Sequence, residues 1–186
     1  MNILFTICGR AGSKGIKNKN IRKFVGKPLP YYTISAIDLF LKKTSLDIEA
    51  DIVVNSDSRE LLQLMKENQL RVVEIIERDE NLAGDCVGKV AVINDCLLKM
   101  ENRKSKKYDI IVDLDITSPL RTVENVEELI IKHIQSKADV TTSVTTARRN
   151  PYFNQVRKTE HGYKKVIPSD YTMRQQAPEI FDMNAS

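Results

Sequence analysis

A glycine-rich segment near the amino terminus carries the densest set of groups that could do chemistry. It has the sequence Gly-Arg-Ala-Gly-Ser-Lys-Gly and covers residues 9–15. Its glycines free the backbone to approach a ligand and to point N–H groups at it. Arg10 and Lys14 add positive charge, and Ser13 adds a hydroxyl donor. Because a polyphosphate needs many donors and several cations, the segment predicts phosphate or nucleotide binding.

Two widespread phosphate-binding patterns do not fit this segment. It lacks the GxxxxGK[ST] pattern of the P-loop, which argues against a P-loop ATPase or GTPase. Its glycines, Gly9, Gly12 and Gly15, also miss the GxGxxG spacing of dinucleotide-binding folds. A second interpretation therefore stays open, in which this is an exposed basic loop whose glycines only form turns.

Two aspartates stand near the end of a later apolar run. Asp113 and Asp115 are two residues apart, so on a strand their side chains point the same way. A carboxylate at a strand tip can hold a Mg²⁺ ion that bridges triphosphate oxygens. Asp115 is the predicted ligand, and Asp113 is a further candidate. The alternative is that Asp115 only caps the turn around Thr117, Ser118 and Pro119.

An alternation of apolar strands and amphipathic helices must position these groups. The predicted strands cover residues 3–8, 51–55, 71–76, 109–114 and 139–146. The predicted helices cover residues 29–43, 59–68, 88–100 and 123–136. Pro28 opens the first helix, Ser56 or Asp57 can cap the second, and Thr122 can cap the fourth. The pattern predicts an α/β fold with a mainly parallel sheet flanked by helices.

Charged and glycine-rich loops follow the first four predicted strands. In an open α/β sheet, ligands bind beyond the carboxyl ends of the strands. We therefore expect these loops to converge on one edge of the sheet. They cover residues 9–22, 55–57, 77–85 and 115–121.

After Arg148 the strand–helix alternation ends. Residues 150–163 contain Pro and Asn and a turn signal at His161-Gly162, which predicts a hairpin outside the main sheet. We predict a nucleotide-binding α/β core at 1–148, a small excursion at 149–175 and a return to the core at 176–186.

Composition excludes several other classes. The chain has 186 residues, 41% hydrophobic and 29% charged, which is typical of one globular domain. It contains no apolar run of the roughly 18 residues that a membrane helix needs, so we expect no membrane partner. The basic run at 103–107 is interpreted as a solvated loop. With 6% aromatic residues and no Trp, a nucleic-acid partner is not expected.

The cysteines and residues 1–8 indicate the cellular compartment of the protein. Three cysteines without motif spacing indicate a reducing compartment, and the presence of only two histidines argues against a His/Cys zinc site. The apolar start at 1–8 has no positive leader before it and no small-residue cleavage site after it. We interpret it as a first strand and expect a cytoplasmic protein.

Several motifs together resemble the acylneuraminate cytidylyltransferases, the CMP-sialic acid synthetases. The specific motif is formed by residues 7–15 with 18–22 and 26–29. Supporting motifs lie at 82–85, 117–121, 174–176 and 184–185. The resemblance spans essentially the whole chain, and residues 113–121 look closest to bacterial members that act on sialic-acid relatives such as legionaminic acid.

The resemblance implies a Rossmann-like fold, CTP and Mg²⁺ as requirements, and a homodimer in which a small excursion reaches over the partner subunit. The anomeric hydroxyl of a sialic-acid-like nine-carbon sugar acid would attack the α-phosphate of CTP, and pyrophosphate would leave. The product would serve a surface glycan. The demands on the protein are mainly positioning and charge neutralisation.

The resemblance also implies roles for nucleotide-binding residues. Arg10 and Lys14 would act in catalysis. The nucleotide would be bound by Arg10, Ala11, Gly12, Ser13, Lys14, Asn20, Arg78 and Asp85, with Asn20 reading the cytosine. Asn20 could instead be only a turn residue, and Asp85 could cap the following helix.

A second set would bind the sugar. It comprises Asp115, Thr117, Ser118, Arg174 and Gln175. The guanidinium of Arg174 would pair with the sugar carboxylate, unless Arg174 is only a surface residue.

The chain departs from the family pattern in three places. Ala11-Gly12 replaces a glycine pair, which should be harmless. The acidic segment ending at Asp115-Ile116 resembles the strand tip of Kdo cytidylyltransferases, and it keeps a Kdo-type or other nucleotidyltransferase open as an alternative. The family pattern runs on for about 40 residues with a last strand, a last helix and an acidic metal-binding pair. A nucleotide-binding fragment without catalysis is therefore the remaining alternative.

Overall fold

The computed structural model describes residues 1–12, 15–84 and 86–184. The chain forms two compact units, Met1–Thr141 and Thr142–Asn184. The three-part division into 1–148, 149–175 and 176–186 stays a prediction. Within the described ranges, the helices are too short or too polar to cross a membrane.

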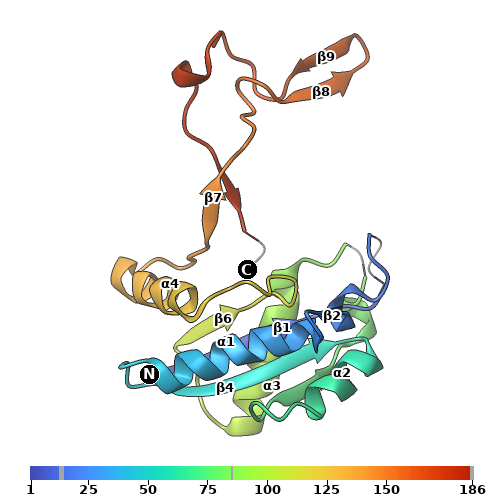
Figure 1. The fold of residues 1–186 in the computed structure, drawn as a ribbon, viewed down its shortest axis with the longest axis vertical. Helices are drawn as coiled ribbons and strands as arrows, with labels where there is room; N and C mark the ends of the chain where they lie inside the picture. Colours follow the sequence, from blue (N-terminus) through green and yellow to red (C-terminus); the bar gives the residue numbers. More distant parts are fainter. Residues whose placement is uncertain (13–14, 85, 185–186) are drawn as a thin grey trace. The chain divides into compact units, whose positions relative to one another are not determined.

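A sheet of four parallel strands forms the centre of the first unit (Figure 1). The strand order is β5-β4-β1-β6. The bounds are β1 Asn2–Cys8, β4 Glu49–Ser56, β5 Glu74–Glu77 and β6 Ile110–Asp113. The central strand β1 pairs with β4 from Asn2 opposite Glu49 to Cys8 opposite Asn55. The predicted α/β class and parallel sheet are confirmed.

Helices cover both faces of this sheet (Figure 1). They are α1 Leu29–Lys43, α2 Arg59–Lys66, α3 Lys89–Lys104 and α4 Val123–Ser136. Ile3, Phe5 and Ile7 of β1 pack with buried residues of α1, α2 and α4. Leu4 packs with Cys96 and Met100 of α3. Because successive strand residues face opposite sides, the inner strand is apolar along most of its length.

Local signals begin the helices. Pro28 precedes α1 and Thr122 caps α4 through a reciprocal bond pair with Asn125, both as predicted. The predicted cap of α2, Ser56 or Asp57, is wrong. Ser58 caps this helix, and its Oγ accepts the N–H of Leu61 at 3.2 Å.

The alternative caps of α2 are already engaged. Ser56 ends β4, and its Oγ accepts the Ser58 N–H at 2.9 Å. Asp57 accepts the N–H of Ala11 at 2.7 Å. The β4 strand therefore continues one residue further than predicted, whereas α2 begins at Arg59, as predicted, and ends two residues earlier, at Lys66.

A tight hairpin precedes α1. It joins β2, Lys23–Phe24, to β3, Lys27–Pro28, and follows the short helix η1, Lys19–Ile21. The two turn residues, Val25 and Gly26, have φ angles of 46° and 81°. Positive φ at both positions is typical of a type I′ turn, which favours Asn or Gly over a β-branched residue.

The predicted fifth strand of the main sheet, 139–146, is wrong. Only Val144–Thr146 forms a strand, β7, and it pairs antiparallel with β10, Phe181–Met183. The preceding stretch is rich in Thr and Ser, and its Val140 is 81% exposed. An inner parallel strand is buried on both faces, and this sequence lacks the apolar residues for that burial.

The second unit contains little buried surface among its described residues. Strands β8, Val156–Thr159, and β9, Gly162–Lys165, form a hairpin, which confirms the predicted one. Gly162 allows its turn with a φ of 103°. A short helix, η3, covers Arg174–Gln176. Large apolar side chains are exposed over this unit: Val144, Val156, Tyr163, Val166, Met173, Phe181 and Met183.

Candidate active site

A cleft of about 720 Å³ lies at the carboxyl edge of the sheet. Its walls come from the loops after β1, β5 and β6 and from the first turns of α3. Its charged and amide residues are Arg10, Lys19, Asn20, Arg78, Lys89 and Asp115. This is the edge at which an open α/β sheet binds ligands. Three of the four loops predicted to converge here line the cleft, and the fourth, after β4, contacts the first through Asp57, which accepts the N–H of Ala11.

The structure brings five of the predicted site residues together on this cleft. They are Arg10, Asn20, Arg78, Asp115 and Thr117. The roles expected for them stay predictions.

The remaining predicted residues lie elsewhere. Ala11 and Gly12 are exposed beside Arg10, and Ser118 is half-buried outside the cleft wall. Arg174 and Gln175 belong to the second unit. Ser13, Lys14 and Asp85 lie outside the described residues.

The loop after β1 is attached to the sheet where it begins. Gly9 donates its N–H to the Asn55 carbonyl at 3.1 Å. A Cβ on Gly9 would lie 2.5 Å from Leu61 Cδ2 and 2.9 Å from Ile116 Cδ1, so close packing requires glycine here. Asn20 Nδ2 donates to the Arg10 carbonyl at 2.9 Å. Asn20 therefore has a structural bond as well as a place on the cleft wall.

Arg78 is a buried cation whose orientation is fixed by one residue. Its Nε donates to Asn55 Oδ1 at 2.6 Å, and its Nη2 donates to the Asn55 carbonyl at 3.2 Å. Asn55 itself is fully buried in β4. A guanidinium held in this way is preorganised for an anion or a nucleotide oxygen. Sequence analysis gave Arg78 a role and placed Asn55 in a loop at this edge without one. The signal for Asn55 is a polar residue at the end of an apolar strand.

A lysine joins the two aspartates at the tip of β6. Lys89 Nζ lies 2.5 Å from Asp113 Oδ2 and 2.6 Å from Asp115 Oδ1. The other Asp113 oxygen accepts the Thr6 hydroxyl at 2.8 Å. Burial alone would lower the pKa of Lys89, but the two carboxylates raise it, and the net shift is upward. Lys89 therefore carries a full positive charge at neutral pH.

Sequence analysis did not single out Lys89. It falls within a predicted helix, where a lysine normally lies on the solvent face. The available signal is its place in the first turn of a helix that starts at the carboxyl edge of the sheet.

The aspartate pair fits a hard divalent cation. Carboxylate oxygens are the donors that Mg²⁺ prefers, and Mg²⁺ commonly uses one or two carboxylates together with substrate phosphates. Asp113 and Asp115 already converge on one positive group, the Lys89 ammonium. Among the described residues, no group of three His, Cys, Asp or Glu side chains could hold a metal. A metal at this pair would therefore need further ligands from phosphate or water.

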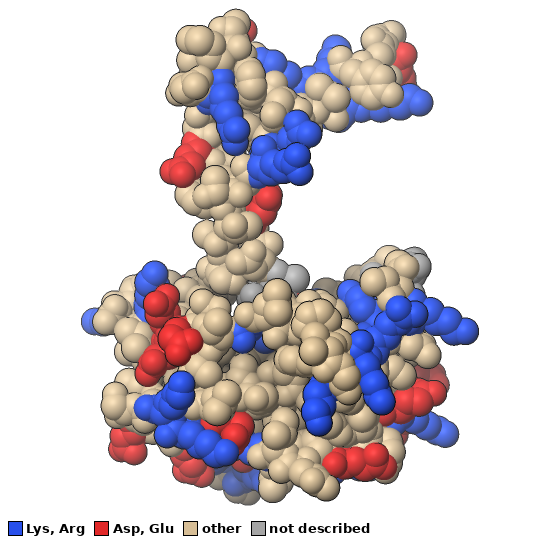
Figure 2. Space-filling model, viewed as in Figure 1, with Lys and Arg blue, Asp and Glu red and all other residues tan. Residues whose placement is uncertain are grey.

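The segment between β1 and α1 carries several exposed basic residues. Figure 2 shows Lys and Arg side chains gathered over the part of the first unit where Figure 1 places β2. The exposed basic residues of this segment are Lys17, Arg22, Lys23 and Lys27. Positive charge collected beside a cleft steers anionic ligands toward it.

Cys8 brings a thiol to the cleft but not a reactive one. It ends β1 and packs against the cluster that contains Cys96. Contact with the Cys96 thiol and burial raise the pKa of Cys8 far above its usual range. Because the thiolate is the nucleophilic form, Cys8 is unsuited to covalent catalysis.

Comparison with known proteins identifies relatives over nearly the whole chain. A family model described as cytidylyltransferase matches residues 4–184. The chain is 34% identical over 184 residues to post-translational flagellin modification protein B of Campylobacter coli, covering 99% of this chain and 75% of that protein. It is 33% identical over 184 residues to the CMP-N,N'-diacetyllegionaminic acid synthase of Campylobacter jejuni, with the same coverage.

A solved structure shares the fold. It is a CMP:2-keto-3-deoxy-manno-octonic acid synthetase complexed with CTP. The TM-score is 0.59 at 16% sequence identity, and the match covers 100% of this chain and 72% of that one.

Proposed function

This chain belongs to the cytidylyltransferase family, and we propose on that premise that it joins CMP from CTP to the anomeric hydroxyl of a sialic-acid-like nine-carbon sugar acid, releasing pyrophosphate. The observation that carries the proposal is the cationic cleft at the carboxyl edge of the sheet. There the motif residues Arg10, Asn20, Arg78 and Asp115 face one space. The names of the relatives support the choice of a sialic-acid-like sugar.

The chemistry exchanges one bond for another at the α-phosphorus. The anomeric oxygen bonds to this phosphorus and loses its proton to solvent, while the bond from the phosphorus to the pyrophosphate oxygen breaks and pyrophosphate leaves with that electron pair. The protein's task is to hold both reactants in line and to neutralise charge as it moves onto the leaving group. Arg10 and Lys14 supply positive charge at the phosphates. Arg78, held by Asn55, fixes the nucleotide in place.

Asn20 is proposed to bind the cytosine. Its Nδ2 donates to the Arg10 carbonyl, which leaves the side-chain oxygen as an acceptor for an amino group. The exocyclic amine of cytosine is such a donor. Uracil has a carbonyl at that position, so this contact favours CTP over UTP.

Mg²⁺ is proposed as the cofactor. Asp115, with Asp113, would hold it, and its positive charge would offset the charge of the triphosphate. The carboxylate pair and its shared cation support this assignment.

The second unit is proposed to bind the sugar acid and to form the homodimer. Arg174 lines a pocket of about 270 Å³ in this unit together with Asn150 and Glu179. A guanidinium pairs well with a carboxylate such as that of the sugar. The many exposed apolar side chains of this unit support an interface with a second copy. CTP as substrate supports a cytoplasmic location.

Pyrophosphate release tests the proposal. We expect release with CTP plus diacetyllegionaminic or N-acetylneuraminic acid, and at least about tenfold slower release with UTP, ATP or GTP. The eight-carbon acid 2-keto-3-deoxy-manno-octonic acid should be a poorer acceptor. Faster release with this acid would assign the chain to the Kdo-type reaction. Tight CTP binding without release from any sugar acid would reduce the chain to a nucleotide-binding module.

A further inference from the structure

Lys89 lies between the two carboxylates that are proposed to hold Mg²⁺. Its ammonium bridges Asp113 and Asp115 at 2.5 and 2.6 Å. The two side chains are only 18% and 22% exposed, so water screens these ion pairs less than it screens surface pairs. One ammonium therefore holds the carboxylates together when no other cation is present.

The arrangement allows Lys89 to leave. The lysine has a flexible four-carbon stem and comes from the first residue of α3, and its side chain is 41% exposed. It lines the same cleft as Arg10 and Arg78, where the phosphates of CTP are proposed to bind. An ammonium displaced from the aspartates can therefore move toward phosphate oxygens without crossing the protein interior.

We propose that Lys89 competes with the divalent cation for the Asp113–Asp115 pair, so that the metal binds weakly to the empty enzyme and tightly only when nucleotide phosphates are present. This inference rests on the proposed metal role of the aspartate pair. A metal ion that binds without nucleotide must displace the ammonium and leave it without an anionic partner among the described residues of the cleft wall. A metal ion that arrives with CTP brings phosphates that pair with Lys89 and complete its own ligand set.

Binding of Mn²⁺ to the enzyme without CTP tests this inference. The signal of free Mn²⁺ in electron paramagnetic resonance reports the bound fraction. We expect wild type to bind weakly and Lys89→Met to bind at least about tenfold more tightly, because a unit charge a few ångströms away is removed. Lys89→Arg keeps the charge and should bind as weakly as wild type. Equal affinity in wild type and Lys89→Met would overturn the proposal.

Two further variants distinguish competition by Lys89 at the aspartate pair from the effect of a change in the net charge of the protein. Lys107→Met makes the same change in net charge, but Lys107 is 85% exposed and pairs with Glu101 away from the cleft. Its Mn²⁺ affinity should match wild type, and a gain as large as that of Lys89→Met would contradict the proposal. Adding Asp115→Asn to Lys89→Met should abolish the gain. If the gain persists, the metal binds elsewhere and the proposal fails.

A measurement on wild type does not depend on how the variants fold. Acetylation of lysine amines by an activated ester, followed by mass spectrometry, reports the accessibility of Lys89 relative to Lys107. Saturating Mn²⁺ without CTP should raise the labelling rate of Lys89 several-fold, because the metal takes its partners. An unchanged rate would show that Lys89 stays in place. Neither experiment contains a sugar, so failure of the proposed transferase reaction is detected separately by pyrophosphate release.

Discussion

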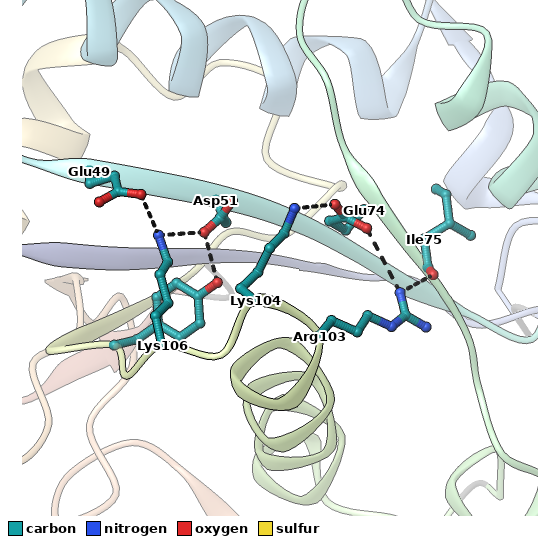
Figure 3. A network of polar contacts seen from close by, with 8 residues as sticks. Glu49, Asp51, Glu74, Ile75, Arg103, Lys104 and Lys106 are labelled. Carbon is teal, nitrogen blue, oxygen red and sulfur yellow. Dashed lines mark hydrogen bonds and ion pairs between the residues drawn. The ribbon is translucent and has the colours of Figure 1, made fainter.

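The two edges of the central sheet use the same charged residue types in opposite ways. At the amino edge, Glu49 and Asp51 of β4 and Glu74 of β5 meet basic residues from the end of α3 and the residues just after it (Figure 3). Lys106 lies 2.8 Å from Asp51 and 3.0 Å from Glu49, and Lys104 lies 2.6 Å from Glu74. At the carboxyl edge, basic residues outnumber acidic ones on the described wall of an open cleft.

The difference separates charged residues that stabilise the fold from charged residues that are available to bind a ligand. At the amino edge Glu49, Asp51 and Glu74 each pair with a lysine, so these ion pairs attach the end of α3 and the residues after it to the sheet. At the carboxyl edge Asp113 and Asp115 share one lysine, while Arg78 is held by the uncharged Asn55. Surplus positive charge in a cleft is costly for an empty protein and favourable once a triphosphate is bound.

The largest expected effect follows from changing an acid of the carboxyl edge. Asp115→Asn keeps the size of the side chain and removes its charge. Turnover should fall by about 10²–10³-fold, because a group that positions charge at the reacting phosphate is lost. The melting temperature should change by no more than about 2 °C. Pyrophosphate release measures the turnover, and a thermal melt measures the stability. A stable variant with normal turnover would show that Asp115 takes no part in the reaction.

A change at the amino edge should have the reverse effect. Lys106→Met breaks the pairs with Asp51 and Glu49 and should lower the free energy of unfolding by about 1–2 kcal/mol. Turnover should be unchanged. Lys107→Met is the matched control, because its exposed pair should contribute less than about 0.5 kcal/mol. Urea denaturation measures the free energy of unfolding of both variants. Equal losses would mean that the network of Figure 3 stabilises the fold no more than an exposed ion pair does.

The amino edge should also contribute to the response to acid. Burial alone would raise the pKa of Asp51, but hydrogen bonds from Lys106 and Tyr108 lower it below its usual value. A lowered pKa in the folded state gives stability that is present above the unfolded value of about 3.9 and is lost as the pH falls through the folded value.

Asp51→Asn should therefore lower stability at pH 7 and make it less dependent on pH below about 4. Urea midpoints measured from pH 7 to pH 2 check this. If the urea midpoint of Asp51→Asn falls with decreasing pH as steeply as that of wild type, Asp51 does not contribute to the loss of stability in acid.

The smallest effect is expected in the hairpin before α1, next to the carboxyl edge. Val25 is 82% exposed and has a φ of 46°, which a β-branched residue adopts with strain. Val25→Asn should raise the free energy of unfolding by about 0.5–1 kcal/mol with no change in turnover. Val25→Thr, which remains β-branched, is the control and should give no gain. A loss of stability in Val25→Asn would mean that the valine side chain makes a contact that outweighs the strain.

Much of this architecture could be predicted because its signals are local. The helix Leu29–Lys43 was predicted with its observed ends, since Pro28 and the apolar spacing mark it. The strands at the centre of the sheet were predicted from continuous apolar runs. Their carboxyl ends then located the cleft, because parallel strands place those ends at one edge.

The errors arose where distant residues decide the outcome. The stretch 139–143 has residues with high β-propensity, but Val140 is its one apolar residue. It therefore lacks the apolar side chains that a strand buried on both faces of the sheet needs. Lys89 and Asn55 acquire their roles only through partners far away in the sequence, Asp113 and Arg78. Spacing along the chain cannot indicate such pairs.

Hydrogen exchange with and without CTP and Mg²⁺ tests the central claim most directly, because it locates the ligand. We predict slower exchange over residues 9–20, 78–89 and 113–117, with no change at the amino edge over 103–108. Protection confined to other parts of the chain, or none at nucleotide concentrations that saturate binding, would contradict the account.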